Sequence, residues 1–479
     1  MSSHHPNSRN TETLPIREIP GSYGLPILGP ILDRLNYFYF QGEEAYFHTR
    51  VRKYNSTVFR ANMPPGPFIS SSSAVVVLLD AASFPVLLDP SKVEKRDVLT
   101  GTYMPSTSFT GRHRMLAYLD PSEPAHAALK QLLFSLLASR RHRFIPEFRR
   151  SFEPLFSALE AEIARNGESN FNALNDSASF DFVARALVGV GTSGAGRDYP
   201  KLAAKWLLPQ VCPVKSTGFL PWWVEELLLH AFPIPAFLVK NDYRKLYDFF
   251  YSGGGEFLDA AEKMGIPREE ACHQLVFIAV FNAYGGFKLA LPLLVKWVGS
   301  AGAELHRQLA EEVRAAVRSA GGEVTPAAVE SMALVKSVVY EALRMEPPIP
   351  YQYGRAKEDM VVESHEAAFR IKKGEMVFGF QPMATRDPKV LERAEEFVGD
   401  RFVGQEGEKL LKYVLWSNGF ETEESRVGNK QCGGKEVVVL ALRLLVVELF
   451  LRYDSLTVGE GKTVEGKVTV VKSVSKAKY

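Results

Sequence analysis

The feature that most constrains the fold of this chain is a cysteine in a glycine-rich loop directly before a long apolar segment. Cys432 is followed by Gly433 and Gly434, and a helix is predicted from about Glu436 to Arg452. A thiolate that binds a metal needs an open loop, whose backbone N–H groups can point at the sulfur, and a rigid element behind it. The arrangement therefore indicates a metal-binding thiolate, with a buried structural cysteine as an equally common alternative.

Two upstream segments strengthen this interpretation. Glu341 and Arg344 are three residues apart on a predicted helix and so share a face, and Arg401 follows in the segment 397–402. An ordinary surface ion pair would explain the first two residues alone. The order Glu-x-x-Arg, then Arg-Phe, then a C-terminal Cys-Gly loop resembles the thiolate-haem cytochrome P-450 superfamily. The resemblance implies that the three charged residues form a buried structural triad that locks the haem-side core.

Length and composition are consistent with one large domain. The chain has 479 residues, and no linker, repeat or low-complexity run divides it. With 57 basic and 55 acidic residues, its net charge of +2 favours neither nucleic acid nor a strongly anionic partner. The three cysteines, Cys212, Cys272 and Cys432, are far apart and predict no disulfide framework, which indicates a reducing compartment.

Helices dominate the predicted secondary structure. Apolar residues at four-residue spacing predict a helix over 304–320, and Thr325-Pro326 is expected to open the helix that holds Glu341. A tight turn is expected at 63–67, and strands are expected at 56–60, 68–70, 75–79, 360–362 and 467–474. The predicted fold class is therefore mainly α with minor β, an α+β cytochrome P-450 fold. One haem-thiolate domain is expected over 14–479, after a flexible segment at 1–13.

The helix predicted over 273–295 carries evidence about the chemistry. Oxygen-activating members of the superfamily place an acid–threonine pair in this helix, because reducing dioxygen requires delivered protons. This chain has the amide of Asn282 there, followed by Ala283, and Gly285 and Gly286 let the backbone approach a ligand closely. The sequence therefore predicts a substrate that brings its own O–O bond and needs neither a proton relay nor a reductase.

Further motifs narrow the resemblance to the plant fatty-acid-hydroperoxide branch, which comprises allene oxide synthases, hydroperoxide lyases, divinyl ether synthases and epoxyalcohol synthases. The match runs from about Leu14 to the C-terminus, and its motifs lie at 64–67, 101–106, 118–124, 281–282, 416–419 and 429–432. The resemblance implies haem b as cofactor, with no NADPH and no flavin. The chain departs from the branch at Arg112-His113, where Gly-Tyr is usual, and at Gly433, where Ala or Pro is usual.

The resemblance also implies the roles of individual residues. Cys432 would be the axial ligand of the haem iron. Asn282 would hydrogen-bond the hydroperoxide and steer its distal oxygen to iron, the alternative being a satisfied buried amide. Lys288 would lie near the substrate and pair with its carboxylate. Four cationic residues would bind the haem propionates, solvated surface charges being the alternative for the lysines: Lys95, His126, Lys130 and Lys430.

The product depends on the carbon radical that follows O–O cleavage and epoxide closure. Oxidation to a cation and loss of a proton gives an allene oxide, whereas return of hydroxyl to a rearranged skeleton gives a hemiacetal that splits into an aldehyde and an oxo-acid. An aromatic face favours the cation. Allene oxide synthases generally have Phe before Thr-Gly-Thr-Tyr, but this chain has Leu99. Leu99 and Ala283 therefore favour a hydroperoxide lyase, with allene oxide synthase (hydroperoxide dehydratase), an enzyme of oxylipin and jasmonate synthesis, as the alternative.

Two further functional classes stay open: a reductase-dependent monooxygenase and a non-catalytic lipid-surface protein. Preference for the 9- or the 13-hydroperoxide and the oligomeric state are also open. The segment 218–239 is aromatic and apolar, but Glu225, Glu226 and prolines interrupt it, so it cannot span a bilayer. It is expected either to dip into a membrane or lipid-droplet surface or to wall a substrate channel. Because Met1 to Thr13 is polar, a cytoplasmic or peripherally membrane-associated location is expected, and a plastid is less favoured.

Overall fold

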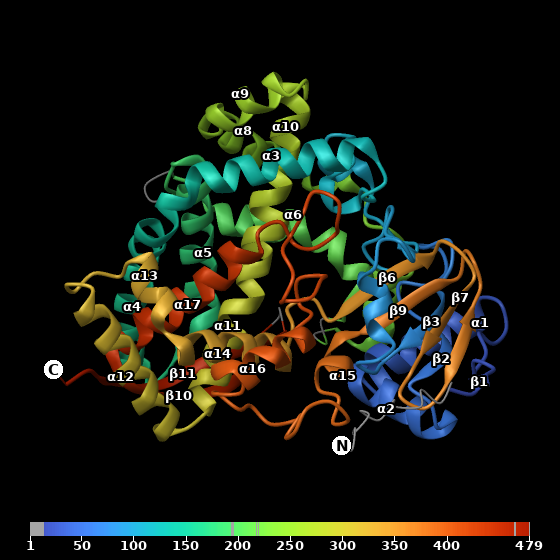
Figure 1. Ribbon diagram of the computed structural model, residues 1–479. Coiled ribbons are helices and arrows are strands. Elements are labelled where there is room, and N and C mark those ends of the chain that lie inside the picture. The colour runs from blue at the N-terminus through green and yellow to red at the C-terminus, as the bar shows by residue number, and fades with distance from the viewer. Residues whose placement is uncertain (1–13, 193–195, 217, 219, 464–465, 479) are drawn as a thin grey trace, which may run out of the picture.

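The computed structural model describes residues 14–192, 196–216, 218, 220–463 and 466–478 (Figure 1). The expected flexible segment 1–13 lies outside these residues. Figure 1 shows most helices on one side of the molecule and the larger sheet, with α1 (Leu28–Leu35) and α2 (Glu43–Tyr54), on the other. The haem-thiolate candidate Cys432 lies on the segment that leads into α17 (Lys435–Arg452).

The helical part is built around one long central helix. Three consecutive segments form it without a break: α10 (Arg268–Val276), the π-helical η9 (Phe277–Tyr284) and α11 (Gly285–Ser300). It packs directly against α5 (Phe171–Val188), α8 (Lys240–Gly253), α9 (Gly255–Lys263), α14 (Ala333–Met345) and α17. It also contacts α6 (Tyr199–Val211) through the Trp206 ring and α12 (Ala303–Ser319) through His306. Two further long helices, α3 (Pro124–Arg140) and α4 (Phe144–Asn166), pack against α5, and all of these helices contribute to the largest hydrophobic core. Shorter helices are α7 (Trp222–Glu225), α13 (Pro326–Ser331), α15 (Gln381–Thr385) and α16 (Gly404–Leu410).

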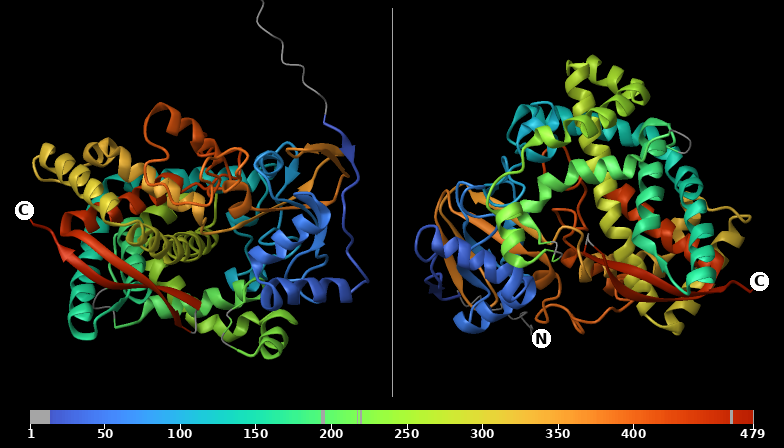
Figure 2. Two further views of the ribbon diagram at one scale, coloured as in Figure 1. Left: turned by 90° about the horizontal axis from the view of Figure 1, so that it is seen from below. Right: turned by 180° about the vertical axis from the view of Figure 1, so that it is seen from behind.

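The described strands form three sheets. The five-stranded sheet has the order β2 (Val58–Asn62), β3 (Ala74–Leu78), β9 (Met376–Phe380), β6 (Tyr351–Ala356), β4 (Val93–Glu94). The second has the order β1 (Ile16–Arg17), β8 (Ala368–Ile371), β7 (Met360–Glu363), and the third β10 (Tyr453–Thr463), β11 (Gly466–Lys476), β5 (Ser169–Asn170). Figure 2 shows the β10–β11 hairpin running along the outside of the helical part, where it contacts α11 and α12.

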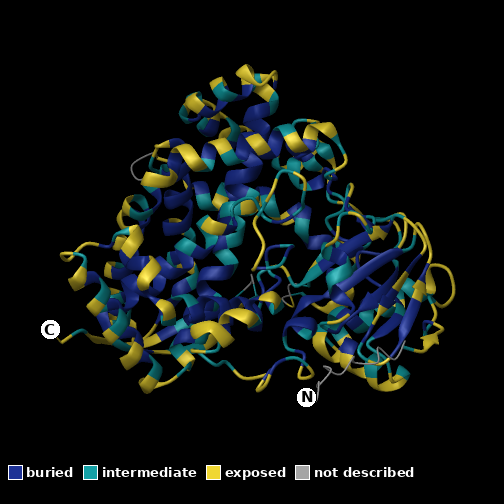
Figure 3. Ribbon diagram, in the orientation of Figure 1, coloured by how far each residue is buried: buried dark blue, intermediate teal, exposed yellow. Residues whose placement is uncertain are grey.

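Burial follows this layout. Figure 3 shows buried residues through the five-stranded sheet and the central helices, with exposed residues on the outer faces. The central helix Arg268–Ser300 is, among the described residues, long and apolar enough to cross a membrane, but 56% of its most apolar window is buried inside the fold. A core helix of a large domain meets the same criteria of length and hydropathy. Here it is the element that presents Asn282 to the site.

The predicted fold class is confirmed, with two local corrections. The helix that Thr325 caps ends at Ser331, because Met332 leaves the helical region at φ −85° and ψ 87°, so Glu341 lies on a separate helix, α14. The strand expected at 68–70 is absent. Gly66 and Phe68 both have positive φ, at 75° and 72°, and such residues turn the chain rather than extend it.

Candidate haem and substrate site

Cys432 is half-buried at the start of α17, where backbone groups fix it. Its N–H donates to the Ser417 carbonyl at 2.7 Å, and its own carbonyl accepts from Lys435 N–H at 3.2 Å. Burial raises the pKa of the Cys432 thiol, whereas the Gly434 N–H and the ammonium groups of Lys130 and Lys435 act in the opposite direction. The sulfur thus sits among donors and positive charges that would stabilise a thiolate bound to a metal.

The chain before Cys432 is held by side-chain amides. Gln431 donates through Nε2 to Ser417 Oγ at 3.1 Å and to the Phe420 carbonyl at 2.8 Å. Asn418, with φ 58°, donates through Nδ2 to the Lys430 carbonyl at 3.1 Å. These contacts tie both ends of the loop 417–431 together, so that the loop delivers Cys432 in a defined position.

The four cationic residues predicted to bind propionates lie within the same region, and within the described part of the chain none of the three lysines forms an ion pair with a carboxylate. Lys95 Nζ donates to Gln352 Oε1 at 3.0 Å and also to Asn418 Oδ1. Lys130 Nζ donates to the carbonyls of Asn429 (2.6 Å) and Gln431 (3.0 Å) and to Asn429 Oδ1 (3.1 Å). Lys430 Nζ donates to the carbonyls of Ala117 (2.7 Å) and Leu119 (2.9 Å).

Burial and mutual repulsion disfavour the positive charges of this cluster. Burial, followed by the Lys430 charge, lowers the pKa of Lys95 to about 7 and the pKa of Lys130 to about 8. Burial also lowers the pKa of Lys430 to about 8 and that of His126 to about 4. His126 Nδ1 is buried and makes no hydrogen bond to a described residue. Two carboxylates would satisfy this nitrogen and stabilise these cations, so the residues present fit the propionates of haem.

The three charged residues of the predicted triad lie in one buried cluster. Arg344 Nε donates to Glu341 Oε2 at 2.7 Å, and Arg401 Nε donates to both Glu341 oxygens at 3.0 Å. Glu341 and Arg344 are fully buried, at 0% side-chain exposure. Arg344 Nη1 also donates to the carbonyls of Thr385 and Ala394 at 3.1 and 2.7 Å. Because every charge has several partners, the cluster ties the segment 385–401 firmly to α14.

Asn282 projects from the π-helical part of the central helix. It is exposed although Val280 and Tyr284 beside it are fully buried, and no hydrogen bond of its side chain is described. It is therefore not a satisfied buried amide, the alternative considered for this position. The preceding Phe281 is half-buried and stacks on Phe277 with ring centroids 4.5 Å apart. An amide and an aromatic ring thus occupy successive positions where an acid–hydroxyl pair would be needed for proton delivery.

Leu99 and Lys288 also had predicted roles, and both make contacts within the protein. Leu99 is half-buried, packs against the largest core, and donates its N–H to the Tyr103 carbonyl at 2.8 Å. Lys288 forms an ion pair with Asp176 of α5 at 2.5 Å. Its ammonium therefore has a carboxylate partner inside the protein, and the expectation that Lys288 pairs with the substrate carboxylate does not fit this geometry. Neither proximity nor charge in the sequence pointed to Asp176, which is 112 positions away.

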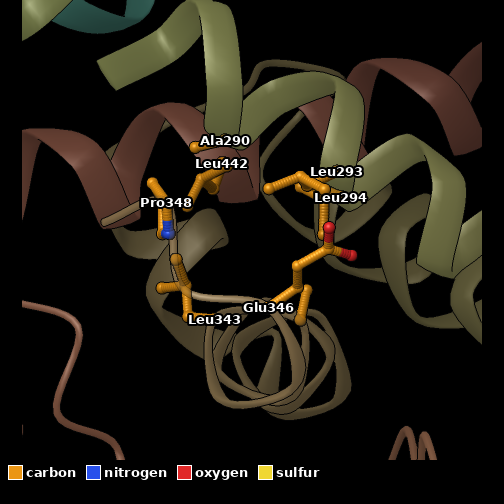
Figure 4. Close-up of a pocket in the computed structure, with 8 residues that line it drawn as sticks. Ala290, Leu293, Leu294, Leu343, Glu346, Pro348 and Leu442 are labelled. Atoms are coloured by element: carbon orange, nitrogen blue, oxygen red, sulfur yellow. The ribbon is translucent and has the colours of Figure 1, made fainter. Parts of the chain in front are cut away.

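A small cavity lies beside the central helix, between α11, α14 and α17 (Figure 4). Its volume is about 10 Å³, and its walls are mostly apolar, formed by residues such as Ala290, Leu294, Leu343 and Leu442, with Glu346 at one side. A space of this size holds about one water molecule. It is a packing defect behind the central helix and has no room for a fatty-acid chain.

Fold and site together define a haem-thiolate protein, and comparison with known proteins agrees. The family model described as Cytochrome P450 matches residues 303–470. The chain is 56% identical over 97% of its length to allene oxide synthase 1, chloroplastic, of Solanum lycopersicum, and covers 88% of that protein. It is 54% identical over 98% of its length to the chloroplastic allene oxide synthase of Arabidopsis thaliana (91% covered), and 56% identical over 97% to allene oxide synthase 2 of Oryza sativa subsp. japonica (97% covered).

The chain therefore belongs to the cytochrome P450 family, in the plant fatty-acid-hydroperoxide branch that holds the allene oxide synthases. This confirms the predicted branch and the predicted haem cofactor. Cys432 could be predicted as the iron ligand from sequence, because the Cys-Gly loop is continuous. Three amides carried no sequence signal of their own: Gln352 accepts a hydrogen bond from Lys95, and Asn418 and Gln431 hold the loop before Cys432. Amides at unrelated positions become partners only through the fold.

The expected location is wrong. Relatives from Solanum lycopersicum, Linum usitatissimum and Arabidopsis thaliana are named chloroplastic, which contradicts the expectation that a plastid is less favoured. The expectation rested on the polar residues 1–13. A polar segment argues against a membrane anchor, but it does not argue against a plastid, because an import signal needs no apolar run.

Proposed function

We propose that this chain is an allene oxide synthase, an enzyme that converts a polyunsaturated fatty-acid hydroperoxide into an allene oxide and water. The observation that carries the proposal is the exposed Asn282 amide on the central helix, in a chain whose full-length relatives bear that name. The overall reaction removes one water molecule from the hydroperoxide. It therefore requires no external oxidant or reductant, and neither NADPH nor a reductase takes part.

The residues of this chain would hold and orient the reactants. Cys432 would bind the haem iron, and Lys95, His126, Lys130 and Lys430 would hold the propionates. The haem would supply cleavage of the O–O bond. Asn282 would position the hydroperoxide through hydrogen bonds of its neutral amide, which delivers no proton to the distal oxygen.

Hydroperoxide lyase is the second candidate, and Leu99 is the observation that favours it. The side chain at this position offers no aromatic face to stabilise a carbocation. The comparisons favour the synthase, which was the alternative in the sequence interpretation. Phe281, half-buried beside Asn282 and stacked on Phe277, would be the aromatic side chain that stabilises a cation on the proposed synthase route.

Product analysis tests the function. Purified haem-loaded protein would receive the 9- or 13-hydroperoxide of linolenic acid without reductant, with Cys432→Ser as the control that removes the proposed iron ligand. Ketols and cyclopentenones in mass spectra, formed from an allene oxide in water, support the synthase. Short aldehydes with matching oxo-acids would instead establish the lyase. Turnover only with NADPH and a reductase would establish a monooxygenase, and no turnover by haem-loaded protein would favour a non-catalytic lipid-surface role.

We also propose that the chain makes peripheral contact with a lipid surface through a continuous apolar patch. The segments 25–40 and 222–238 form this patch. They are joined by an ion pair between Arg34 and Glu226 and by the Phe40 and Trp222 rings, whose centroids are 5.6 Å apart. The patch residues are 45–73% exposed: Leu25, Ile27, Leu28, Leu32, Phe40, Trp222, Trp223, Leu227, Leu228, Phe232, Phe237 and Leu238. Phe219, which belongs to the predicted segment, lies outside the described residues.

The composition of the patch supports contact with a lipid surface rather than a role as the wall of a substrate channel. Its charged residues turn inward, since Glu225 is fully buried and Glu226 is paired with Arg34, so that the outer face keeps tryptophan, leucine and phenylalanine. Tryptophan is favoured at the boundary between lipid headgroups and hydrocarbon. Such a surface would collect a fatty-acid hydroperoxide where it is formed, at the membrane.

A further inference from the structure

The loop 111–118 and the first turn of the central helix bring together three side chains that nothing in the proposed function uses. His113 lies on the loop, and Glu269 and His273 lie four residues apart on one face of α10. One ligand atom from each residue lies within 4.8 Å of the others. In Figure 1, α10 is at the top of the molecule, at the opposite end of the central helix from α11. The loop continues to Ala117, whose carbonyl accepts from Lys430 at 2.7 Å, so the cluster neighbours the haem-side cations without including any of them.

The most buried of these side chains, His273, is held in one orientation. Its ring stacks on Tyr243 with an interplanar angle of 9°, and the Tyr243 hydroxyl lies 2.6 Å from Nδ1. If Nδ1–H donates to that hydroxyl, Nε2 presents its lone pair to the cluster. A histidine whose second nitrogen is held by a hydrogen bond in this way is arranged as metal-ligating histidines usually are.

The loop is shaped to bring His113 to this nitrogen. A Cβ at Gly111 would lie 2.1 Å from His273 Nε2, and Gly111 has φ 64°, so only glycine permits the approach. Gln274 then clamps the loop to α10, accepting from Leu116 N–H at 3.0 Å and donating to the Arg114 carbonyl at 2.9 Å. The two elements that carry the cluster are thus fixed to each other before any ion arrives.

The two remaining side chains can adjust around the fixed histidine. His113 stacks near His273 with ring centroids 5.2 Å apart and is about one-third exposed, while Glu269 is exposed. Ligand atoms around a tetrahedral zinc ion are ~3.3 Å apart, from metal–ligand distances near 2.0–2.1 Å. The ligand atoms lie within 4.8 Å of one another, so His113 and Glu269 must rotate toward His273 for all three to bind one ion. The exposed side leaves an entry path and a position for water.

We propose that His113, Glu269 and His273 form a binding site for a divalent transition-metal ion of the zinc type, with water as the fourth ligand. Two imidazoles and one carboxylate are the donor set that zinc takes in sites with an open position. His113 occurs where the branch usually has tyrosine, so the site is a property of this chain rather than of the resemblance. The bound ion would join the loop that carries Ala117, whose carbonyl accepts from Lys430, to the helix that carries Asn282.

Isothermal titration with zinc sulfate tests the proposal on tag-free, EDTA-washed, haem-loaded protein. We expect one bound ion, a rise in melting temperature with zinc, and loss of both in His113→Tyr. This change restores the residue usual in the branch at a side chain that is about one-third exposed, so the fold accommodates it. Glu269→Gln should also weaken binding. His142→Tyr, a change at an exposed histidine elsewhere, is the matched control and should bind as the unmodified chain does. Equal zinc affinity in His113→Tyr and the unmodified chain would overturn the site.

Two further measurements separate a true site from adventitious binding. Zinc-edge X-ray absorption should show nitrogen and oxygen ligands; sulfur ligands would place the ion on a cysteine and overturn the proposal. Tyr243→Phe removes the hydroxyl that orients His273 and should weaken zinc binding by about 10- to 100-fold, as loss of a ligand's hydrogen-bond partner does. These readouts do not depend on turnover, so they stand whether or not the proposed enzymatic function is correct.

Discussion

At the scale of single residues, Lys95 shows how the haem site depends on pH. Burial and the Lys430 charge lower its pKa to about 7, whereas a bound propionate would favour the protonated form. Haem binding is therefore coupled to proton uptake above pH 7. The affinity for haem is highest below that pKa, where Lys95 is already protonated. It falls as pH rises through that pKa, by up to about tenfold per pH unit for one such group.

Lys95→Arg should make this pH dependence shallower, because the guanidinium stays charged throughout. The measurement is titration of the apoprotein with haem between pH 6.5 and 9, followed by the Soret absorbance. Lys130 and Lys430 keep part of the dependence, so the slope should decrease without vanishing. Lys409→Arg, on the exposed surface of α16, should leave it unchanged. Identical slopes in Lys95→Arg and the unmodified chain would mean that Lys95 does not face the propionates.

Leu99 lies at a position that we expect to influence the choice between allene oxide and aldehyde products. Leu99→Phe adds an aromatic face, which stabilises a nearby cation by about 0.5–2 kcal/mol and should raise the ratio of ketols to aldehydes about two- to thirtyfold. Phe281→Leu should shift the ratio in the opposite direction. Mass spectrometry of the products from one hydroperoxide measures both. An unchanged ratio in Leu99→Phe would show that this position only fills space against the core.

At the scale of elements, α14 shows that two ion pairs with the same sequence spacing can differ in burial. Glu341–Arg344 and Glu304–Arg307 are both i,i+3 pairs, yet the first is fully buried and the second is exposed. Glu341→Gln leaves Arg344 and Arg401 without their carboxylate and should lower the free energy of unfolding by about 3–5 kcal/mol. Glu304→Gln should cause no measurable change. Urea unfolding of the two haem-loaded variants compares them, and equal stabilities would mean that the buried triad contributes nothing.

The elements with regular periodicity were predictable from sequence, and their junctions were not. Apolar spacing gave α12 and α17 to within one residue of their observed ends. The break at Met332 was missed because the residues on either side of it favour a helix. It depends on Glu312 of α12, whose carboxylate accepts from the N–H groups of Leu334 and Val335 at 2.9 Å, so that α14 begins there as a separate helix. The π-helical segment 277–284 that exposes Asn282 was also missed, since it depends on packing rather than on a residue type.

Some residues of the candidate site could likewise be predicted from sequence, and others could not. Cys432, Glu341 and Arg344 stand in continuous motifs, so their roles could be inferred from neighbouring residues. The partner of Lys288 could not, because Asp176 is brought to it by packing of α5 against α11. Charge alone cannot distinguish a lysine that awaits a substrate from one that already has a carboxylate beside it. The sequence therefore supports a prediction for the iron ligand better than one for the substrate-binding residues.

At the scale of the whole molecule, the apolar patch decides where the protein works. Trp222→Ser with Trp223→Ser removes two large exposed side chains and should weaken binding to vesicles of phosphatidylcholine and phosphatidylglycerol at least about tenfold. Vesicle flotation measures the bound fraction. Val361→Ser, 54% exposed on β7, is the matched control outside the patch. Unchanged flotation of the double variant, or no flotation of the unmodified chain, would exclude the lipid contact.

The crowded cations around Cys432 have a consequence for the life of the protein in a cell. Without haem, the folded chain must keep three lysines and a histidine close together. The carboxylates of Asp120 and Glu123 do not offset their burial and mutual repulsion, which penalises the native state. Haem removes that penalty and binds only the folded form, so it shifts the folding equilibrium by mass action. We expect the apoprotein to be degraded faster than the holoprotein. Supply of the cofactor would then set the abundance of the enzyme as well as its activity.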